Sequence, residues 1–221
     1  MSVPHGDSEP FSSHMIARGN RRFTNIELFS SLSDHMFMGR PKNFSREEVL
    51  EKAIPVFWKK GFADTSLQDL ERATGVNKSG LYAEFRDKED LFVASLRHYL
   101  ESQGRRGLLT RKPLGWENVE NFLKNGPLRK GERQGCFSVN SMRESAILPD
   151  KANEVVAENR LQLRRLLAMN IEAEKPRMNP SAIAEMALSF FSGLCIEHNL
   201  KSGQASSTRK IENFMTALRG L

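Results

Sequence analysis

Cysteine is scarce in this sequence, with Cys136 and Cys195 the only two among 221 residues. Two cysteines cannot form the disulfide framework that stabilises many small secreted domains. Histidine is also rare, and the spacing of its five copies does not match a metal site. No run approaches the roughly 20 uncharged apolar residues of a membrane helix, and no apolar stretch of signal-peptide length begins the chain. We therefore expect a cytoplasmic protein without a metal or another cofactor.

Alternation of polar and apolar residues, the pattern typical of β-strands, is missing as well. Apolar residues instead recur at helical spacing, and hydrophobic residues make up 39% of the chain, which is enough for a core. These patterns predict an all-α fold. No nucleophile, base and orienting group occur together at a recognisable spacing, which disfavours an enzyme.

The chain changes character near residue 38. Residues 1–38 are rich in Ser, His, Asn and Gly and lack a sustained period, which favours a disordered extension or a start assigned too far upstream, with Met38 as the true beginning. A structured arm is a third interpretation. Beyond this segment we expect two domains, residues 39–92 and 93–221. The net charge of +6 does not distinguish their roles, because residues 39–92 carry as many acidic as basic side chains.

Several capping signals predict where the first helices begin. Ser45 with Glu48 forms a capping box before a helix that Gly61 ends, and Pro55 should bend that helix. The second helix begins either at Thr65 with Gln68 or at Ser66 with Asp69, and it ends before Gly75. Asn77 and Asp87 cap the third and fourth helices. We expect helices at about 46–60, 66–74, 78–85, 88–103, 116–124, 150–172, 180–200 and 206–219.

Two short helices separated by a tight glycine turn and followed by a longer helix are typical of a helix-turn-helix. The second helix of such a pair exposes its first residues to base edges in the major groove. Here Lys78 is suited to guanine acceptors, Gly80 to close approach of the duplex, and Tyr82 and Lys88 to phosphate oxygens. The predicted DNA-binding residues are Thr65, Ser66, Asn77, Lys78, Ser79, Gly80, Tyr82 and Lys88.

The segments 61–70, 74–85 and 88–91 together resemble the N-terminal signature of the TetR/AcrR family of bacterial transcriptional regulators. Gly39-Arg40-Pro41-Lys42 is similar to the basic start common in that family. The resemblance implies a homodimer with one DNA-binding head per subunit, usually a repressor, whose C-terminal helices form an effector pocket and the dimer interface. Glu84 departs from the family pattern, because many members have His or Tyr beside the DNA at this position.

The C-terminal half holds the candidate effector and sensor residues. Phe137, Met142, Met186 and Phe190 suggest a pocket for a small apolar or aromatic effector. The apolar faces of the helices at 180–200 and 206–219 predict the dimer interface. Cys195 is expected in the core. The basic side chains of Arg105, Arg106, Arg111 and Lys112 are expected to form a solvated face.

Cys136 has two interpretations. It is either a small buried hydrophobic residue or a reactive sensor whose pKa Arg133 and Arg143 would lower. Gly135-Cys136-Phe137 resembles the start of a central helix in one branch of the family, in which some members sense electrophiles through a cysteine. Three functions remain open: a repressor released from a palindromic operator by a small molecule, a redox- or electrophile-sensing repressor acting through Cys136, and an architectural DNA-binding protein without an effector.

Overall fold

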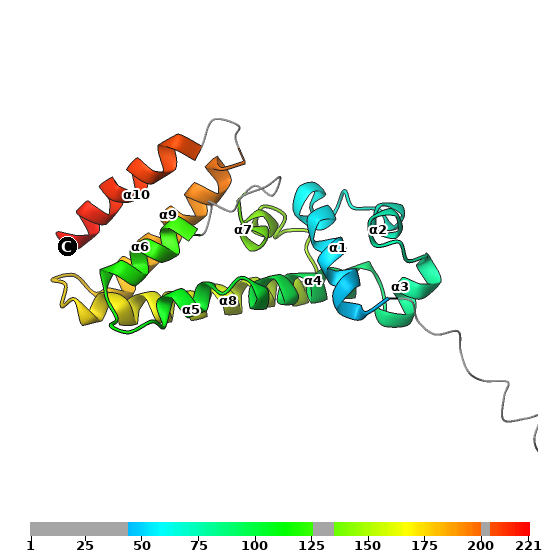
Figure 1. The fold of residues 1–221 in the computed structure, drawn as a ribbon, viewed down its shortest axis with the longest axis horizontal. Helices are drawn as coiled ribbons and strands as arrows, with labels where there is room; N and C mark the ends of the chain where they lie inside the picture. Colours follow the sequence, from blue (N-terminus) through cyan, green and yellow to red (C-terminus); the bar gives the residue numbers. More distant parts are fainter. Residues whose placement is uncertain (1–43, 126–134, 200–203) are drawn as a thin grey trace, which may run out of the picture. The chain divides into compact units, whose positions relative to one another are not determined.

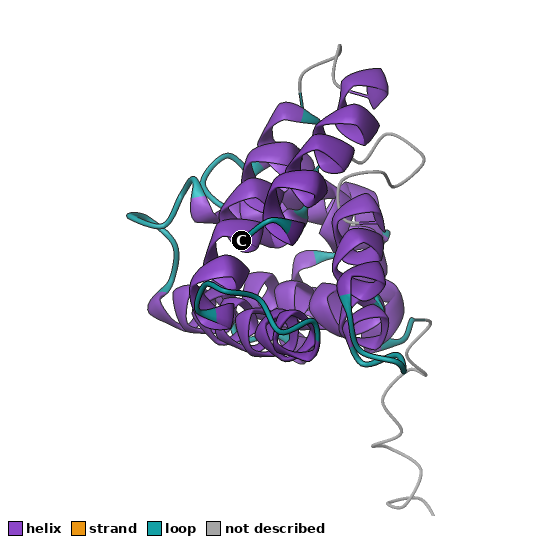
Figure 2. Cartoon of the chain, turned by 90° about the vertical axis from the view of Figure 1, so that its left-hand side faces the viewer, coloured by secondary structure: helices purple, strands orange, loops and turns teal. Residues whose placement is uncertain are grey.

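The computed structural model describes residues 44–125, 135–199 and 204–221, all of which lie in one compact unit, Phe44–Leu221. Every regular element of these residues is a helix, which confirms the all-α fold (Figures 1 and 2). The helices are α1 Arg46–Lys60, α2 Leu67–Thr74, α3 Lys78–Glu84, α4 Lys88–Ser102, α5 Arg105–Leu109, α6 Trp116–Asn125, α7 Phe137–Met142, α8 Asp150–Ala173, α9 Pro180–Glu197 and α10 Gln204–Arg219. The expected N-terminal extension, residues 1–38, lies outside the described residues.

Helices α1 to α4 pack around a shared apolar core. α1 begins at the predicted capping box, where Ser45 Oγ accepts a hydrogen bond from the Glu48 amide at 3.1 Å and the Glu48 carboxylate accepts one from the Ser45 amide at 2.8 Å. α1 contacts both α2 and α4, and the rings of Phe57 and Phe92 meet edge to face with centroids 5.0 Å apart. Such aromatic pairs add to the stabilisation that burial alone provides. The helix continues through Pro55.

The long helix α8 organises the C-terminal part of the unit. It packs most extensively on α9 and also contacts α4, α5 and α6 (Figure 1). A buried amide fixes part of this arrangement: Asn170 Oδ1 accepts hydrogen bonds from the Asn118 side chain at 2.8 Å and from the Gly115 amide at 3.1 Å. Its Nδ2 donates to the Leu109 carbonyl at 2.8 Å. Because buried polar groups are costly unless they are hydrogen-bonded, this network holds the α5–α6 connection at one position on α8.

Two helices were absent from the ranges expected from helical periodicity, although the family resemblance of Gly135-Cys136-Phe137 had indicated a helix start there. Residues 105–109 form α5, which the glycines and prolines around them concealed, and α7 is a short helix of six residues after Cys136. The expected domain boundary between residues 92 and 93 falls inside α4, which contacts both α1 and α8. In the described ranges no helix is long and apolar enough to cross a membrane, and no cluster of His, Cys, Asp or Glu could hold a metal ion.

Candidate DNA interface

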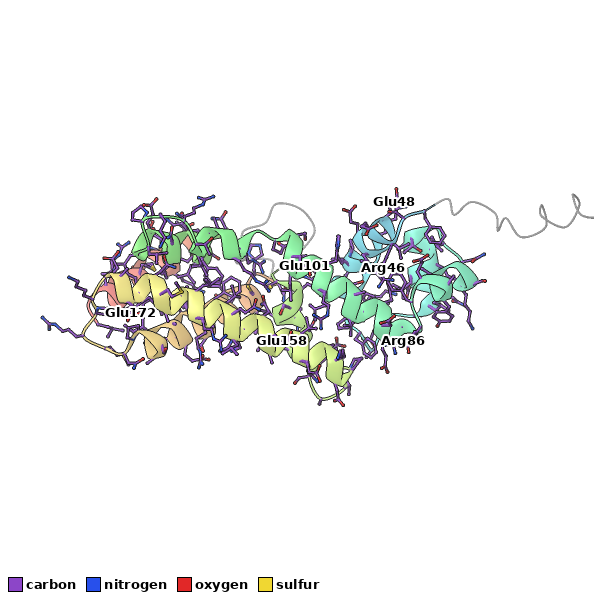
Figure 3. The ribbon with its side chains drawn as sticks, turned by 90° about the horizontal axis from the view of Figure 1, so that it is seen from below. Arg46, Glu48, Arg86, Glu101, Glu158 and Glu172 are labelled. Atoms are coloured by element: carbon purple, nitrogen blue, oxygen red, sulfur yellow. The ribbon has the colours of Figure 1, made fainter. Side chains whose placement is uncertain are left out.

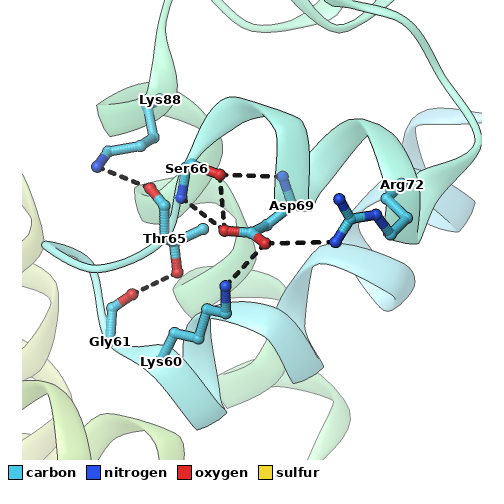
Figure 4. Close-up of polar contacts among 7 residues, drawn as sticks. All are labelled: Lys60, Gly61, Thr65, Ser66, Asp69, Arg72 and Lys88. Atoms are coloured by element: carbon cyan, nitrogen blue, oxygen red, sulfur yellow. Dashed lines mark hydrogen bonds and ion pairs between the residues drawn. The ribbon is translucent and has the colours of Figure 1, made fainter.

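The start of α2 uses Ser66 and Asp69, which decides between the two possible capping pairs. The Asp69 amide donates to Ser66 Oγ at 3.2 Å, and the Ser66 amide donates to the Asp69 carboxylate at 3.0 Å (Figure 4). Thr65 is buried, and its hydroxyl donates to the Gly61 carbonyl at 2.6 Å. The expectation that the side chain of Thr65 could cap α2 was therefore wrong, because that side chain closes the preceding turn instead.

Asp69 is held in its charged form by neighbouring cations and donors. Lys60 Nζ lies 2.7 Å from the Asp69 carboxylate, and Arg72 lies 3.9 Å from it (Figure 4). The hydrogen bond from Lys60, followed by those from Ser66, holds the pKa of Asp69 well below its usual range. A fixed carboxylate at the N-terminus of α2 also interacts favourably with the helix dipole.

The first turn of α3 presents polar side chains to solvent. Asn77 caps this helix, because its Oδ1 accepts a hydrogen bond from the Gly80 amide at 2.8 Å, and the Lys78 amide donates to the carboxylate of Glu71. Lys78 and Ser79 are exposed, and 40% of Tyr82 is exposed one turn later. With these side chains free of the core, α3 has the surface that a recognition helix needs.

Gly80 has an internal role that the sequence did not suggest. A Cβ at this position would lie 2.6 Å from Val76 Cγ1 and 3.3 Å from Asn77 Oδ1. Val76 is buried, so it has little room to move. The absence of a side chain at Gly80 thus allows the turn between α2 and α3 to pack closely, whatever its role at the DNA.

Lys88 joins α4 to the loop between α1 and α2. Its ammonium donates to the carbonyl oxygen of Thr65 at 3.0 Å (Figure 4). It also donates to the carbonyl oxygen of Phe62 at 2.9 Å and lies 4.4 Å from the centroid of the Phe62 ring. A lysine ammonium has three N–H donors, so two hydrogen bonds leave one donor for a further acceptor. The predicted phosphate contact would use this remaining donor.

Arg46 is a cation near α3 that the sequence interpretation missed. Its guanidinium donates to the Glu84 carbonyl at 2.7 Å and lies 4.2 Å from the centroid of the Phe85 ring. Arg86 follows α3 and pairs with Asp90 at 3.5 Å; both arginines are labelled in Figure 3. Arg46 was overlooked because its contacts are with residues far away in the sequence, and only its place in the capping box was visible.

The four residues predicted to line an effector pocket have different surroundings. Phe137 is buried against aromatic rings of α1 and α4. Phe190 stacks on Phe214 with centroids 3.8 Å apart, which joins α9 to α10. Met142 and Met186 are 38% and 42% exposed. The structure therefore does not place these four side chains in one common environment.

Cys136 is buried next to a cation and a phenol. Arg105 Nη1 donates to Cys136 Sγ at 3.1 Å, and the Tyr99 hydroxyl donates to the same sulfur at 3.5 Å. Arg105 also donates to the Tyr99 hydroxyl at 3.0 Å. Only 8% of Arg105 is exposed, so its expected place on a solvated basic face was wrong. Its burial could not be foreseen, because the cysteine that it contacts is distant in the sequence.

The pKa of the Cys136 thiol is lowered by its surroundings. The main cause is a hydrogen bond from Cys195, and the charge of Arg105 and the hydrogen bond from Tyr99 act in the same direction, against the effect of burial. The expected cations were different ones: Arg143 is exposed, and Arg133 lies outside the described residues. Cys195 is buried as expected.

Comparisons with known proteins agree with this geometry. Residues 49–95 match the family model described as bacterial regulatory proteins, tetR family. The HTH-type transcriptional repressor ComR of Escherichia coli K12 is 34% identical over 137 residues, which cover 58% of this chain and 64% of ComR. The HTH-type transcriptional regulator YezE of Bacillus subtilis is 35% identical over 48% of this chain and 58% of YezE. The chain thus spans less than two thirds of either relative.

The fold resembles solved structures over a larger share of the chain. The TetR family transcriptional regulator CifR, solved as a cysteine mutant with 26-bp double-strand operator DNA, matches 80% of this chain and 99% of its own, with a TM-score of 0.71 and 25% identity. The reduced form of E. coli NemR matches 80% of this chain and 95% of its own, with a TM-score of 0.67 and 21% identity. Residues 49–95 thus match the TetR family of bacterial regulatory proteins, and the chain, with its capped helix-turn-helix and this helical C-terminal region, is similar in fold to TetR-family structures.

Proposed function

We propose that the protein is a transcriptional repressor that binds a palindromic double-stranded operator as a homodimer and is released by a small molecule. One observation carries the DNA-binding part: the first turn of α3 exposes Lys78, Ser79 and Tyr82 on a capped helix-turn-helix. The similarity to CifR, whose structure contains operator DNA, supports the same partner for this chain. Repression is proposed by analogy with ComR, which is named a repressor.

The DNA contacts divide between bases and phosphates. Lys78 would donate to guanine in the major groove, while Tyr82 and Lys88 would donate to phosphate oxygens. Thr65 would contribute through its backbone, because its hydroxyl is bonded to Gly61. Ser66, Asn77, Ser79 and Gly80 complete the proposed interface.

Selection from a random pool of duplexes tests this proposal directly. We expect the full chain to enrich a palindrome whose half-site centres are about 34–36 Å apart, the distance between successive major grooves on one side of the duplex. The matched variant Lys78→Ala should enrich a degenerate half-site. Binding without any enriched sequence would contradict the proposal and indicate the architectural alternative.

The proposed dimer interface uses the exposed parts of α9 and α10. Many apolar residues expected at this interface are instead buried within the protomer, including Ile183, Ala187, Ile211 and Met215. Among the described large apolar side chains of α9, those that remain accessible are Met186 at 42%, Ile196 at 45% and the half-buried Phe190. These residues would supply the apolar centre of a two-fold interface.

Gly193 offers a selective test of the dimer. It is exposed on α9, and a Cβ there would meet nothing within 4 Å, so a large side chain fits the protomer. We expect Gly193→Arg to give a folded monomer by light scattering and circular dichroism, whereas the unmodified chain has a dimer mass. The control Gly107→Arg, also open to solvent, should remain a dimer. A dimer that persists in Gly193→Arg would place the interface elsewhere.

Release through Cys136 is the second candidate, favoured by the contact between Cys136 and the buried Arg105. The lowered pKa of Cys136 favours its thiolate, which is the form that reacts with oxidants and electrophiles. We expect Cys136→Ser to bind the operator but to lose its response to a small thiol oxidant such as hydrogen peroxide. If the Ser variant responds as the parent does, the effector is a non-covalent ligand.

A further inference from the structure

The fold brings the two cysteines of the chain together. Cys136 precedes α7 and Cys195 lies near the end of α9, and these two helices pack together, so that each cysteine perturbs the pKa of the other. The backbone explains this approach: a side chain on Gly135 would collide with the Cys195 carbonyl oxygen. Gly135 has φ of 75°, a left-handed conformation that glycine adopts readily. The close approach thus depends on the residue directly before Cys136.

The surroundings of the two sulfurs are unequal. Arg105 and Tyr99 donate to Cys136 at 3.1 and 3.5 Å. The pKa of Cys195 is raised, first by its hydrogen bond to Cys136 and then by burial, whereas that of Cys136 is lowered. Cys136 is therefore the nucleophilic thiolate and Cys195 the neighbouring thiol. The lowered pKa suits Cys136 to attack a peroxide first. Cys195 can attack afterwards, because the Cys136 sulfur that raises its pKa is then no longer an anion.

We propose that Cys136 and Cys195 form an intrachain disulfide when the protein reacts with a hydroperoxide. This disulfide would be the chemical basis of the release through Cys136 proposed above, on which it rests. Burial favours this reaction over alkylation, because an adduct on Cys136 needs space beside Arg105, while a disulfide uses the thiol of a residue whose backbone already lies against Gly135, next to Cys136. A small peroxide can reach the pair during local opening of the fold.

The reaction proceeds in two steps. The Cys136 thiolate attacks one peroxide oxygen, the O–O bond breaks, and the leaving alkoxide takes a proton to become an alcohol, or water from hydrogen peroxide. Cys136 is then a sulfenic acid. The sulfur of Cys195 loses its proton and attacks the sulfur of Cys136; the S–O bond breaks, and the departing hydroxide combines with that proton as water. Two thiols lose two electrons, and the peroxide gains them.

Disulfide formation would alter the packing of the DNA-binding helices through two neighbours of Cys136. A disulfide sulfur carries no charge, so Arg105 loses an anionic partner while it remains buried, which destabilises the present packing. Phe137, the next residue, lies against Trp58 of α1 and Phe92 of α4, with ring centroids 6.1 and 5.6 Å away. A shift at Cys136 therefore displaces a ring that supports both helices.

The first test follows the thiols in the full chain. The reduced protein is treated with hydrogen peroxide, denatured, alkylated with iodoacetamide and digested for mass spectrometry. We expect both thiols to disappear, a peptide pair joining Cys136 to Cys195 to form, and dithiothreitol to restore both. In Cys195→Ser we expect a sulfenic acid on Cys136 that dimedone traps. Two thiols that still alkylate after treatment, or a disulfide between chains, would overturn the inference.

Arg105→Gln tests whether the cation activates the pair. We expect oxidation to slow by about tenfold or more, because thiolate formation depends on the nearby charge. The matched control Arg106→Gln changes an exposed neighbour and should react at the parent rate. Since loss of a buried arginine can unfold the chain, Tyr99→Phe is the second variant, and it should slow oxidation several-fold. Parent rates in folded Arg105→Gln or in Tyr99→Phe would contradict the assignment.

Operator affinity before and after oxidation separates this inference from the proposed function. We expect the reduced protein to bind and the oxidised protein to bind at least tenfold more weakly, with recovery after dithiothreitol. No specific binding by the reduced protein would refute the proposed function. Normal binding without disulfide formation, or a complete disulfide with unchanged affinity, would refute the inference alone.

Discussion

The carboxylate of Glu144 accepts a hydrogen bond from the backbone amide of Phe62 at 2.7 Å. Its other oxygen accepts one from the Ala63 amide at 3.3 Å. Glu144 follows α7, whereas the two amides lie in the loop that leads to α2. Lys88 binds two carbonyl oxygens of the same loop. The loop before the helix-turn-helix is thus held from both sides, by an anion on its N–H groups and a cation on its C=O groups.

Glu144→Ala should lower the free energy of unfolding by about 1–3 kcal/mol, because two charge-assisted hydrogen bonds are lost. Denaturant titration measures this change. The control Glu154→Ala removes an exposed side chain whose contact with Lys151 spans 3.6 Å, and it should cost at most about 1 kcal/mol. Equal effects of the two changes would show that the Glu144 contact does not hold the loop.

Lys88→Ala should weaken both the fold and the DNA complex. Loss of the bonds to Phe62 and Thr65 should lower the free energy of unfolding by about 1–3 kcal/mol. Loss of the proposed phosphate contact should also reduce the slope of log affinity against log salt by about one. Denaturation and salt-dependent binding measure these separately. A less stable variant with an unchanged salt slope would restrict Lys88 to the loop.

Lys78→Ala should cost about 1–3 kcal/mol of operator binding and relax the preference at particular bases. Tyr82→Phe should instead weaken binding to all sequences alike, since a phosphate contact carries no base information. Binding to a panel of single-base operator variants distinguishes the two. An unchanged base preference in Lys78→Ala would remove this residue from base readout.

Gly80→Ala should destabilise the fold by about 1–3 kcal/mol, because its new methyl group would overpack against Val76. Gly107→Ala is the matched control: it lies in the short helix α5, and a Cβ there meets nothing within 4 Å. Replacing this helical glycine should stabilise the protein by about 0.5–1 kcal/mol. Opposite signs in thermal denaturation would support the packing role of Gly80, and a neutral Gly80→Ala would exclude it.

The stability of the folded protein should fall at acidic pH as Asp69 becomes protonated. Its pKa is lowered in the folded chain from an ordinary value of 3.8, so its contribution is present above about pH 4 and is lost as the pH falls below that value. The gap between the melting temperatures of the parent and Asp69→Asn should be constant from pH 5 to 7 and shrink below pH 4. Lys60→Met should flatten this change, since Lys60 is the main cause of the shift. A gap independent of pH would contradict the prediction.

Local signals in the sequence predicted the helices well, because caps depend on residues three or four positions apart. Ser45, Asn77 and Asp87 cap their helices as expected. Choosing Ser66 over Thr65 required the position of the Gly61 carbonyl, which only the folded loop provides.

Contacts between distant segments could not be predicted from these local signals. The bonds from Arg105 to Cys136 and from the Phe62 amide to Glu144 join residues far apart along the chain. Neither pair has a spacing that marks it in a single sequence. The candidate DNA surface could therefore be predicted from the sequence, whereas the buried thiol pair and the contacts that hold the α1–α2 loop could not.

The aromatic cluster around Phe137 has an optical consequence. Trp58 and Trp116 are the two tryptophans of the chain. The Trp58 ring lies 4.9 Å from that of Tyr99 and 6.1 Å from that of Phe137, while Trp116 lies on α6. Emission from Trp58 should therefore follow any movement of the ring next to Cys136, against a steady background that Trp116→Phe would remove. Stopped-flow fluorescence of the unlabelled protein could then measure the rates of conversion between the reduced and oxidised forms.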